Sequence, residues 1–292
     1  MIECFKFAHC FLYADDIKIV APITNHSDCE RLQNDMDAFS AWSVHNKLLL
    51  NVSKCKVLSF FRIRSPIFHQ YSLYNTGIAR VEFISDLGVI FTSDLSFERH
   101  IDSIIAKAYI MLGFIKRNCR DFCDPLTLKS LYVTFVRSIL EYASQVWSPF
   151  YQCHSNRIES VQKQFIMFAL RGLPSQQVIE FVLPPYRERC NLLKLHQLNH
   201  RRDVASAIFI QDVLNHRADC SVLLARLKFY APQRCVRRRE GFLRIDSVST
   251  NYGLAEPILS MSRIFNSTYN KFDFNLSRDS FRKQLLTFFN QN

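Results

Sequence analysis

The apolar periodicity of this chain changes at about residue 96, and that change limits its possible folds more than any other feature. Upstream, apolar residues form short β-prone runs between polar turns, for example over residues 10–14 and 17–20. Downstream, they follow the three-four repeat of an amphipathic helix. The longest such repeat comprises Ile101, Ile104, Ile105, Ala108, Met111, Leu112 and Ile115. The sequence therefore predicts an α+β fold, with strands near the N-terminus and mostly helices after residue 96.

The N-terminal part is predicted to contain a hairpin, a helix and further strands. Residues 10–14 and 17–20 have the composition of a hairpin. Ser27 as N-cap and Glu30 at N3 form a capping box, which predicts a helix that begins at Asp28. Strands are expected over residues 48–50, 57–61 and 87–91, and a second hairpin over residues 68–73 and 78–83.

Three consecutive helices are predicted beyond residue 96. Asp124 as N-cap with Pro125 at N1 begins the second helix, and Ser155 is expected to cap the third. Their apolar stripes predict a helical bundle. The three helices are expected over residues 98–117, 125–141 and 155–171. Inward residues on the second and third are expected to be Leu128, Leu131, Phe135, Val136, Ile139, Ile158, Val161, Phe165 and Phe168. After residue 174 the pattern is weaker, and helices are expected near residues 187–201, 203–215, 219–229 and 278–290.

Charge is distributed unevenly along the chain, whose net charge is +11. Residues 1–61 contain 6 Lys and Arg against 7 Asp and Glu, whereas residues 62–292 contain 31 against 19. A nearly neutral head followed by a basic body is typical of a nucleic-acid binder, although basic proteins without such partners are common.

Cysteine content and hydropathy bear on the cellular compartment. The chain has 10 cysteines, and the C-x3-C pair Cys119 and Cys123 lacks a second pair at zinc-finger spacing, so thiols are favoured over a zinc site. No apolar run approaches the roughly 18 residues that span a bilayer. The N-terminus also lacks the pattern of a signal peptide. We therefore expect an intracellular protein of the nucleus or cytoplasm, with reduced thiols and no membrane partner.

Two adjacent carboxylates, Asp15 and Asp16, fall between the strands of the first predicted hairpin. The favoured hairpin turns need positive φ, which Asn-Gly and Asp-Gly supply, so Asp-Asp gains nothing there. The two charges repel each other unless a cation lies between them. Taken alone, the pair is compatible both with a metal site and with an ordinary solvated turn.

Four ordered motifs over roughly residues 8–172 resemble the reverse transcriptases of non-LTR (LINE-type, jockey-like) retrotransposons. FLYADD at residues 11–16 resembles the Y-x-D-D motif in its F/Y-A-D-D form, and LNVSKC at residues 50–55 resembles the later palm segment with its lysine. LGV at 87–89 with F-x-x-H-I at 97–101, and SILEYASQVW at 138–147, are similar to the passages that follow the palm. Residues 173–292 resemble the C-terminal tails of these proteins less specifically.

The resemblance implies an RNA-directed DNA polymerase with a right-hand fold, acting on an RNA template and a DNA primer by two-metal nucleotidyl transfer with Mg²⁺. Asp15 would then be a metal ligand and Asp16 its weaker companion. Tyr13 would lie beside the primer end. Lys54 would approach the leaving pyrophosphate, although a solvated lysine in a turn is an equal alternative.

On the same resemblance, residues 1–61 are a partial palm, residues 62–172 a primer-grip-like hairpin with a helical thumb, and residues 173–292 a basic, mostly helical C-terminal region. Leu87 and Gly88 would be adjacent to the primer. Outward basic residues of the thumb would face the duplex, some of them only as a solvated surface. These residues are Lys107, Lys116, Arg117, Lys129, Arg157 and Lys163.

Polymerases of this family take a further carboxylate from a strand well upstream of the Y-x-D-D hairpin, and this chain has only Glu3 before Asp15. We therefore expect a C-terminal piece that binds Mg²⁺ weakly or not at all and is inactive alone. Its exposed palm sheet would favour self-association. The alternatives are a non-catalytic basic nucleic-acid-binding module, or a retrotransposon remnant without a function.

Overall fold

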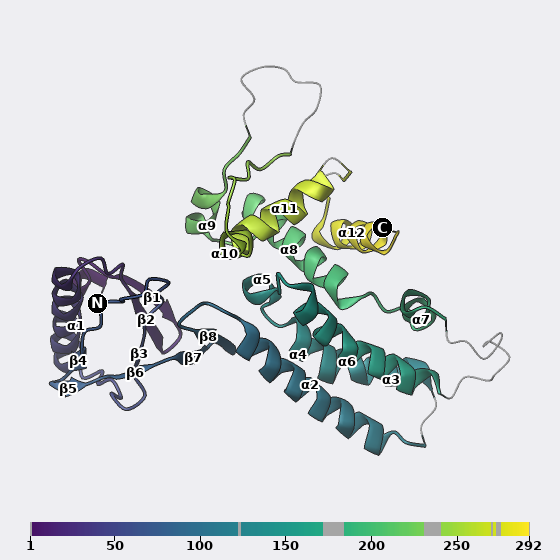
Figure 1. Ribbon diagram of the computed structural model, residues 1–292, viewed down its shortest axis with the longest axis horizontal. Coiled ribbons are helices and arrows are strands. Elements are labelled where there is room, and N and C mark those ends of the chain that lie inside the picture. The colour runs from purple at the N-terminus through teal and green to yellow at the C-terminus, as the bar shows by residue number, and fades with distance from the viewer. Residues whose placement is uncertain are drawn as a thin grey trace. The chain divides into compact units, whose positions relative to one another are not determined.

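The computed structural model describes residues 2–121, 124–171, 184–230, 241–269, 271–272 and 276–291; Cys123 lies outside them. The chain forms two compact units, Met1–Arg99 and His100–Asn292 (Figure 1). Within the described residues, the strands all precede helix α2 and helices dominate after it. This confirms the predicted α+β class.

The first unit consists of one long helix, α1 (His26–His45), and four two-stranded sheets. The strands are β1 (His9–Tyr13) with β2 (Asp16–Val20), β3 (Lys56–Leu58) with β6 (Ala79–Val81), β4 (Ser72–Leu73) with β5 (Thr76–Gly77), and β7 (Phe83–Asp86) with β8 (Val89–Thr92). All pairs are antiparallel except β3 with β6, which is parallel. A short 3-10 helix, Ile2–Cys4, precedes β1.

One apolar cluster holds three of these small sheets, β1–β2, β3–β6 and β4–β5, against α1. Its buried members come from α1 and from the β4–β5 region, namely Cys29, Met36, Tyr71, Leu73 and Ile78. Partly buried residues from β2, from the turn before β3 and from β3 itself pack against it, namely Ile19, Val52, Cys55 and Val57. Each sheet is too small to be stable alone, so the helix supplies the surface that they share.

Helix α1 begins two residues earlier than the sequence predicts. Asn25, not Ser27, is the N-cap, with extended backbone (φ −151°). The Asn25 side chain accepts a hydrogen bond from the Asp28 backbone N–H at 2.9 Å, and Asp28 accepts the Asn25 N–H at 3.3 Å. This capping box displaces the predicted one because Asp28 also accepts both the N–H and the hydroxyl of Thr24.

Two of the predicted strand pairings are wrong. Residues 48–50 form no strand, and Leu48 and Leu49 are exposed after the end of α1. Residues 68–73 and 78–83 do not form one long hairpin, because β6 pairs with β3 instead. Of the predicted hairpin only the short β4–β5 pair and its tight turn form, and in that turn Tyr74 and Asn75 have φ of 48° and 59°.

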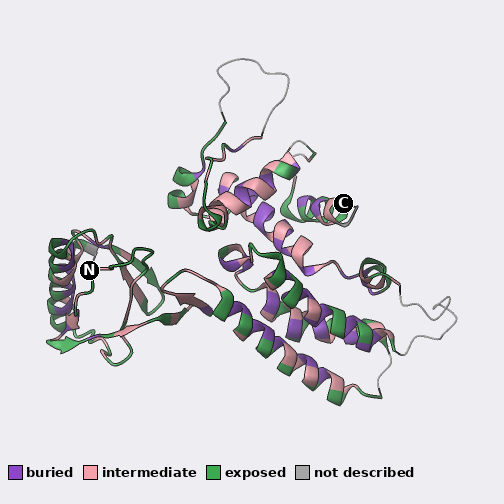
Figure 2. Ribbon diagram, in the orientation of Figure 1, coloured by how far each residue is buried: buried purple, intermediate pink, exposed green. Residues whose placement is uncertain are grey.

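The second unit is helical. Its helices are α2 (Glu98–Asn118, whose first two residues belong to the first unit), α3 (Pro125–Tyr132), α4 (Ser138–Glu141), α5 (Ser144–Trp147), α6 (Gln152–Leu170), α7 (Tyr186–Leu192), α8 (Leu198–Leu214), α9 (Ser221–Arg226), α10 (Asn251–Leu254), α11 (Pro257–Tyr269) and α12 (Arg278–Gln291). Figure 2 shows buried and exposed residues alternating along α2, as expected of a helix with one apolar face. All the residues of its predicted stripe are buried except Met111, which is partly buried.

The predicted second helix is interrupted by a π-helical turn over Val133–Arg137, between α3 and α4. The buried positions are therefore Leu128, Tyr132, Val136 and Leu140, and Phe135 is exposed instead of inward. A π-helical turn contains more residues than an α-helical turn, so buried positions here recur at every fourth residue. The prediction assumes the alternating three- and four-residue spacing of an α-helix and therefore places Phe135 inside. Asp124 does cap this helix, as predicted, by accepting from the N–H groups of Leu126 and Thr127.

Ser155 does not cap the third helix, because α6 already begins at Gln152. The serine lies in the interior of the unit, where its hydroxyl accepts a hydrogen bond of 2.8 Å from the buried Arg202 of α8. The predicted inward face of this helix is confirmed, since Ile158, Val161 and Phe165 are fully buried.

Helix α8 is the centre of the second unit. It packs against α5 and α6 on the N-terminal side of the chain and against α11 and α12 on the C-terminal side (Figure 1). The buried carboxylate of Glu159 on α6 accepts the Leu198 N–H at 3.0 Å and the hydroxyl of Tyr186. A negative charge at the N-terminus of α8 stabilises that helix through its dipole and its unpaired N–H groups.

Candidate metal and nucleic-acid site

The two adjacent carboxylates lie at the tip of the β1–β2 hairpin. Tyr13 pairs with Asp16, so Ala14 and Asp15 form a two-residue loop. Ala14 has φ of 52°, a left-handed conformation that hairpin turns usually assign to glycine. Within the described part of the chain, neither Asp15 nor Asp16 has a hydrogen-bond or ion-pair partner on its side chain. The hairpin therefore presents two exposed, unneutralised carboxylates on a strained turn, and such strain concentrates at functional sites.

The exposed character of the hairpin extends to its apolar residues. Phe11, Leu12 and Tyr13 are all exposed, as is Val20 at the end of β2. Such a surface is compatible with the expected self-association, which stays a prediction.

Asp35, a residue of α1 that the sequence analysis did not single out, fixes the chain segment that enters the hairpin. Its buried carboxylate accepts the backbone N–H groups of Lys6 at 3.1 Å and of Phe7 and Ala8, both at 2.8 Å. Burial alone would raise the pKa of Asp35, but the three N–H groups outweigh burial and hold its pKa below the ordinary value. The base of β1 is thus clamped to the helix while its tip stays free.

The turn that carries Leu87 and Gly88 is connected to the same hairpin. Lys18 of β2 forms an ion pair of 2.6 Å with Asp86, the last residue of β7. Leu87 and Gly88, which follow Asp86, have φ of 45° and 82°, as a type I′ turn requires. Leu87 and Gly88, expected within a strand over residues 87–91, instead form the turn between β7 and β8. One ion pair joins this turn to the strand that begins at Asp16.

Lys54 is exposed on the turn that precedes β3. The turn is closed by the Lys54 N–H, which donates to the Asn51 carbonyl at 3.0 Å. Its neighbours Val52 and Cys55 pack on the same cluster as Ile19 of β2. Lys54 and the carboxylate pair thus belong to one packed body, although within the described residues no hydrogen bond or ion pair joins their side chains.

The donor set at the hairpin fits Mg²⁺ in part. Mg²⁺ is a hard cation that is held by one or two carboxylates together with water and substrate phosphates. Asp15 and Asp16 supply two such groups. Among the described residues, no cluster of three or more His, Cys, Asp or Glu side chains could hold a metal ion. The carboxylate pair supplies two of the ligands that such a Mg²⁺ site would use.

The six basic residues predicted to face a duplex all lie in the second unit, in different surroundings. Lys107 and Arg117 are exposed on α2. Arg157 forms an ion pair of 2.5 Å with Asp102. Lys129 donates to the Lys194 carbonyl at 3.0 Å, and partial burial lowers the pKa of its ammonium group. These last two cations are already engaged within the protein.

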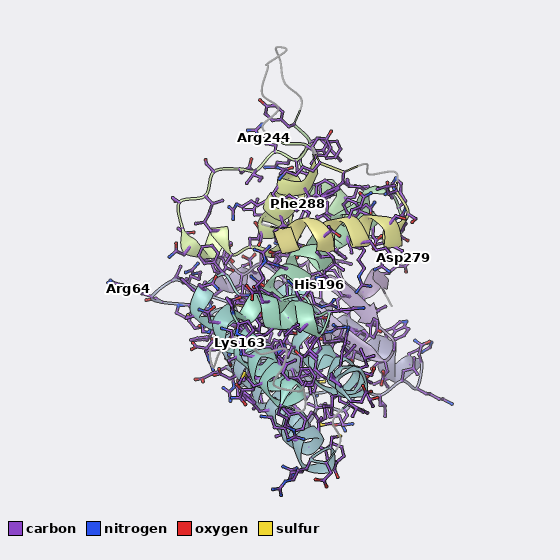
Figure 3. All side chains as sticks on the ribbon, turned by 90° about the vertical axis from the view of Figure 1, so that its right-hand side faces the viewer. Arg64, Lys163, His196, Arg244, Asp279 and Phe288 are labelled. Atoms are coloured by element: carbon purple, nitrogen blue, oxygen red, sulfur yellow. The ribbon has the colours of Figure 1, made fainter. Side chains whose placement is uncertain are left out.

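Lys116 and Lys163 are the two basic residues that the structure brings together. They line an open depression of about 410 Å³ between α2 and α6, together with Gln164, Met167 and Phe168. Arg171 lies beside it, with its guanidinium 3.8 Å from the centre of the Phe168 ring. Lys163 is labelled in Figure 3. Arg171 also donates to the backbone carbonyls of Cys119 and Arg120, so its guanidinium is already engaged within the protein.

No protein-family model, curated protein or solved structure matches this chain. The identity of the site therefore has to be argued from its own residues.

Among the described helices, none is both long and apolar enough to cross a bilayer. The eight cysteines that the structure describes, including Cys119, are free thiols.

Proposed function

We propose that the chain carries the Y-x-D-D hairpin, primer-adjacent turn and helical thumb of a non-LTR retrotransposon reverse transcriptase, an RNA-directed DNA polymerase. The observation that supports it most directly is the coupling of two strained hairpin turns. Ala14 beside the carboxylate pair and Leu87 beside Gly88 both have positive φ, and the Lys18–Asp86 ion pair joins their hairpins. Backbone strain of this kind is often found at functional sites, which supports a functional role for the two linked turns.

In this proposal each residue has a role that follows from its position. Bound Mg²⁺ would lower the pKa of the attacking hydroxyl and neutralise charge on the transferred phosphate. Asp15 and Asp16 would hold the metal from the hairpin tip. Tyr13, exposed on the strand beside them, would support the primer end. Lys54 would neutralise the pyrophosphate as it leaves, and the Leu87–Gly88 turn would orient the primer strand.

Terbium luminescence tests the metal site without requiring catalysis. Tb³⁺ prefers the same oxygen ligands, and its emission is sensitised by a nearby tyrosine such as Tyr13. We expect Tb³⁺ to bind the full chain and only a large excess of Mg²⁺ to displace it, because two carboxylates alone should hold Mg²⁺ weakly. Asp15→Asn should weaken Tb³⁺ binding at least about tenfold. Losing a residue that only orients a metal ligand already lowers metal affinity by about that much, and losing the ligand itself should cost no less.

Asp37→Asn is the matched control, because Asp37 is exposed on α1 and hydrogen-bonds only to Gln33 of its own helix. This variant should bind Tb³⁺ as the unmodified chain does. Unchanged binding in Asp15→Asn and Asp16→Asn would show that the pair is not a metal site, and the proposal would be abandoned.

A second candidate function, a nucleic-acid-binding module without catalysis, is favoured by one observation. Lys116 and Lys163 line one open depression of the second unit, where a phosphate backbone could contact both. This module requires neither Asp15 nor Asp16.

A further inference from the structure

A long stretch of the first unit contains no acidic residue. Between Asp37 and Glu82 the sequence has no Asp or Glu and contains six cations, namely Lys47, Lys54, Lys56, Arg62, Arg64 and Arg80. The net charge of residues 1–61 is nearly zero, but the charged residues are unevenly distributed, because all 7 acids lie within the first 37 residues. The first unit thus contains its own basic segment, separate from the thumb.

The loop over residues 59–69, within this stretch, exposes aromatic rings beside arginines. The exposed fractions are 50% for Phe60, 37% for Phe61 and 53% for Phe68. Every residue from 60 to 65 is exposed. Figure 3 shows Arg64 at the outer end of this loop, with its side chain extending away from the ribbon. A loop that served only as a connection would gain nothing from exposing three phenyl rings to water.

The loop is held in a defined shape by Arg80 of β6. The Arg80 guanidinium donates to the Ser59 hydroxyl at one end of the loop and to the His69 carbonyl, at 2.6 Å, near the other. It also lies 5.1 Å from the centre of the Phe68 ring. Phe68 and Phe61 meet edge to face, with ring centres 5.7 Å apart. The Phe61 and Phe68 rings are thus held in place on a braced loop, which lowers the entropy cost of binding.

We propose that this aromatic-basic loop is a binding site for single-stranded nucleic acid. Unpaired bases would stack on Phe60 and on the Phe61–Phe68 pair, while Arg64 contacts the phosphate backbone. A hydrogen bond from the Thr92 hydroxyl chiefly holds the pKa of Asp94 below its ordinary value, and the charge of Arg62 lowers it further, so part of the Arg62 charge is used within the protein. Duplexes would bind less well, because their bases are already stacked on one another. The proposal is independent of the reverse-transcriptase assignment, since it uses neither carboxylate of the hairpin.

The test is fluorescence anisotropy of the full chain with a labelled oligothymidylate of about 15 nucleotides, compared with a duplex of the same length. Phe60→Ala should weaken single-strand binding about five- to tenfold and leave duplex binding unchanged, whereas Phe60→Trp should preserve it. Arg64→Ala should reduce the slope of log affinity against log salt by about 0.7, the value for one phosphate of a single strand.

Matched controls lie in the second unit. Phe135 is similarly exposed, at 45%, and Arg226 is an exposed arginine at the end of α9. Phe135→Ala and Arg226→Ala should leave single-strand affinity unchanged, and thermal melting would verify that all variants fold. Equal losses on single strand and duplex, equal effects of loop and control variants, or no binding of oligothymidylate would each overturn the proposal.

Discussion

At the scale of single residues, one carboxylate on α1 determines where the chain enters the hairpin. Asp35→Asn would replace an anion that accepts three backbone N–H groups with a neutral amide that has one acceptor oxygen. We expect the free energy of unfolding to fall by about 2–3 kcal/mol, because hydrogen bonds to a charged group are the strong ones. Urea unfolding at neutral pH measures this loss.

The effect of Asp35 should depend on pH. Its folded-state pKa lies below the ordinary value of 3.8, so its stabilisation is complete above that value and disappears as the pH falls through the folded-state pKa. The difference between the unmodified chain and Asp35→Asn should therefore shrink in acid. Asp37→Asn, two residues further along the same helix, should change stability by less than about 0.5 kcal/mol. An equal loss in both variants would contradict the clamp.

Asp203 on α8 shows the opposite behaviour. Burial raises the pKa of its carboxyl to about 6, although Arg202 lowers it in part. The folded chain therefore holds this proton more tightly than the unfolded chain. Asp203 should lower the free energy of unfolding as the pH rises from about 4 to 6 and have no further pH-dependent effect above pH 6. Asp203→Asn should stabilise the protein above pH 6 by on the order of 2 kcal/mol. Thermal melting of both proteins at pH 4 and pH 7.5 measures this stabilisation. An equal gain in stability at the two pH values would show that the pKa of Asp203 is not raised.

At the scale of elements, the hairpin tip can be relieved of its strain. Ala14→Gly should stabilise the hairpin by about 1 kcal/mol, because glycine adopts the φ of 52° without steric cost. Ala38→Gly, exposed on α1, is the control and should destabilise by about the same amount, since glycine weakens a helix. Denaturant unfolding distinguishes the two signs. A destabilised Ala14→Gly would mean that the turn carries no strain.

The depression between α2 and α6 gives a second test at this scale. Lys116→Gln with Lys163→Gln should weaken duplex binding and reduce its salt slope by about 0.9 for each phosphate that the variant no longer neutralises. Arg157→Gln is the control, because Arg157 is already paired with Asp102. Salt titration of duplex affinity measures both. If the control lowers the slope equally, dispersed charge and not the depression binds the duplex.

Elements with strong local signals could be predicted from the sequence, and those that depend on distant partners could not. The stripe of α2, the Asp124 cap and the β1–β2 hairpin each depend on residues a few positions apart. The parallel β3–β6 pair, the Asp35 clamp and the Lys18–Asp86 ion pair join residues more than 20 positions apart, which no local pattern encodes. The π turn escaped prediction because it keeps helical composition while changing the period.

At the scale of the whole molecule, we expect the purified chain to show no DNA synthesis on a primed RNA template with Mg²⁺ and nucleotides. Two-metal transfer needs more ligands than the carboxylate pair, and the described residues contain no cluster of three. Primer extension measures this. Incorporation that Asp15→Ala abolishes would show that the chain assembles a complete site.

The central position of α8 also matters while the chain is being synthesised. Helices α5 and α6 leave the ribosome first, but their packing partner α8 follows later, and α11 and α12, which cover α8, come last. The end of α8 at Leu214 follows the end of α6 at Leu170 by 44 residues, which at about 5–20 residues per second takes roughly 2–9 seconds. During that time the apolar faces of α5 and α6 that pack against α8 have no covering layer. Nascent chains stalled near residue 170 should therefore recruit chaperones that full-length chains release.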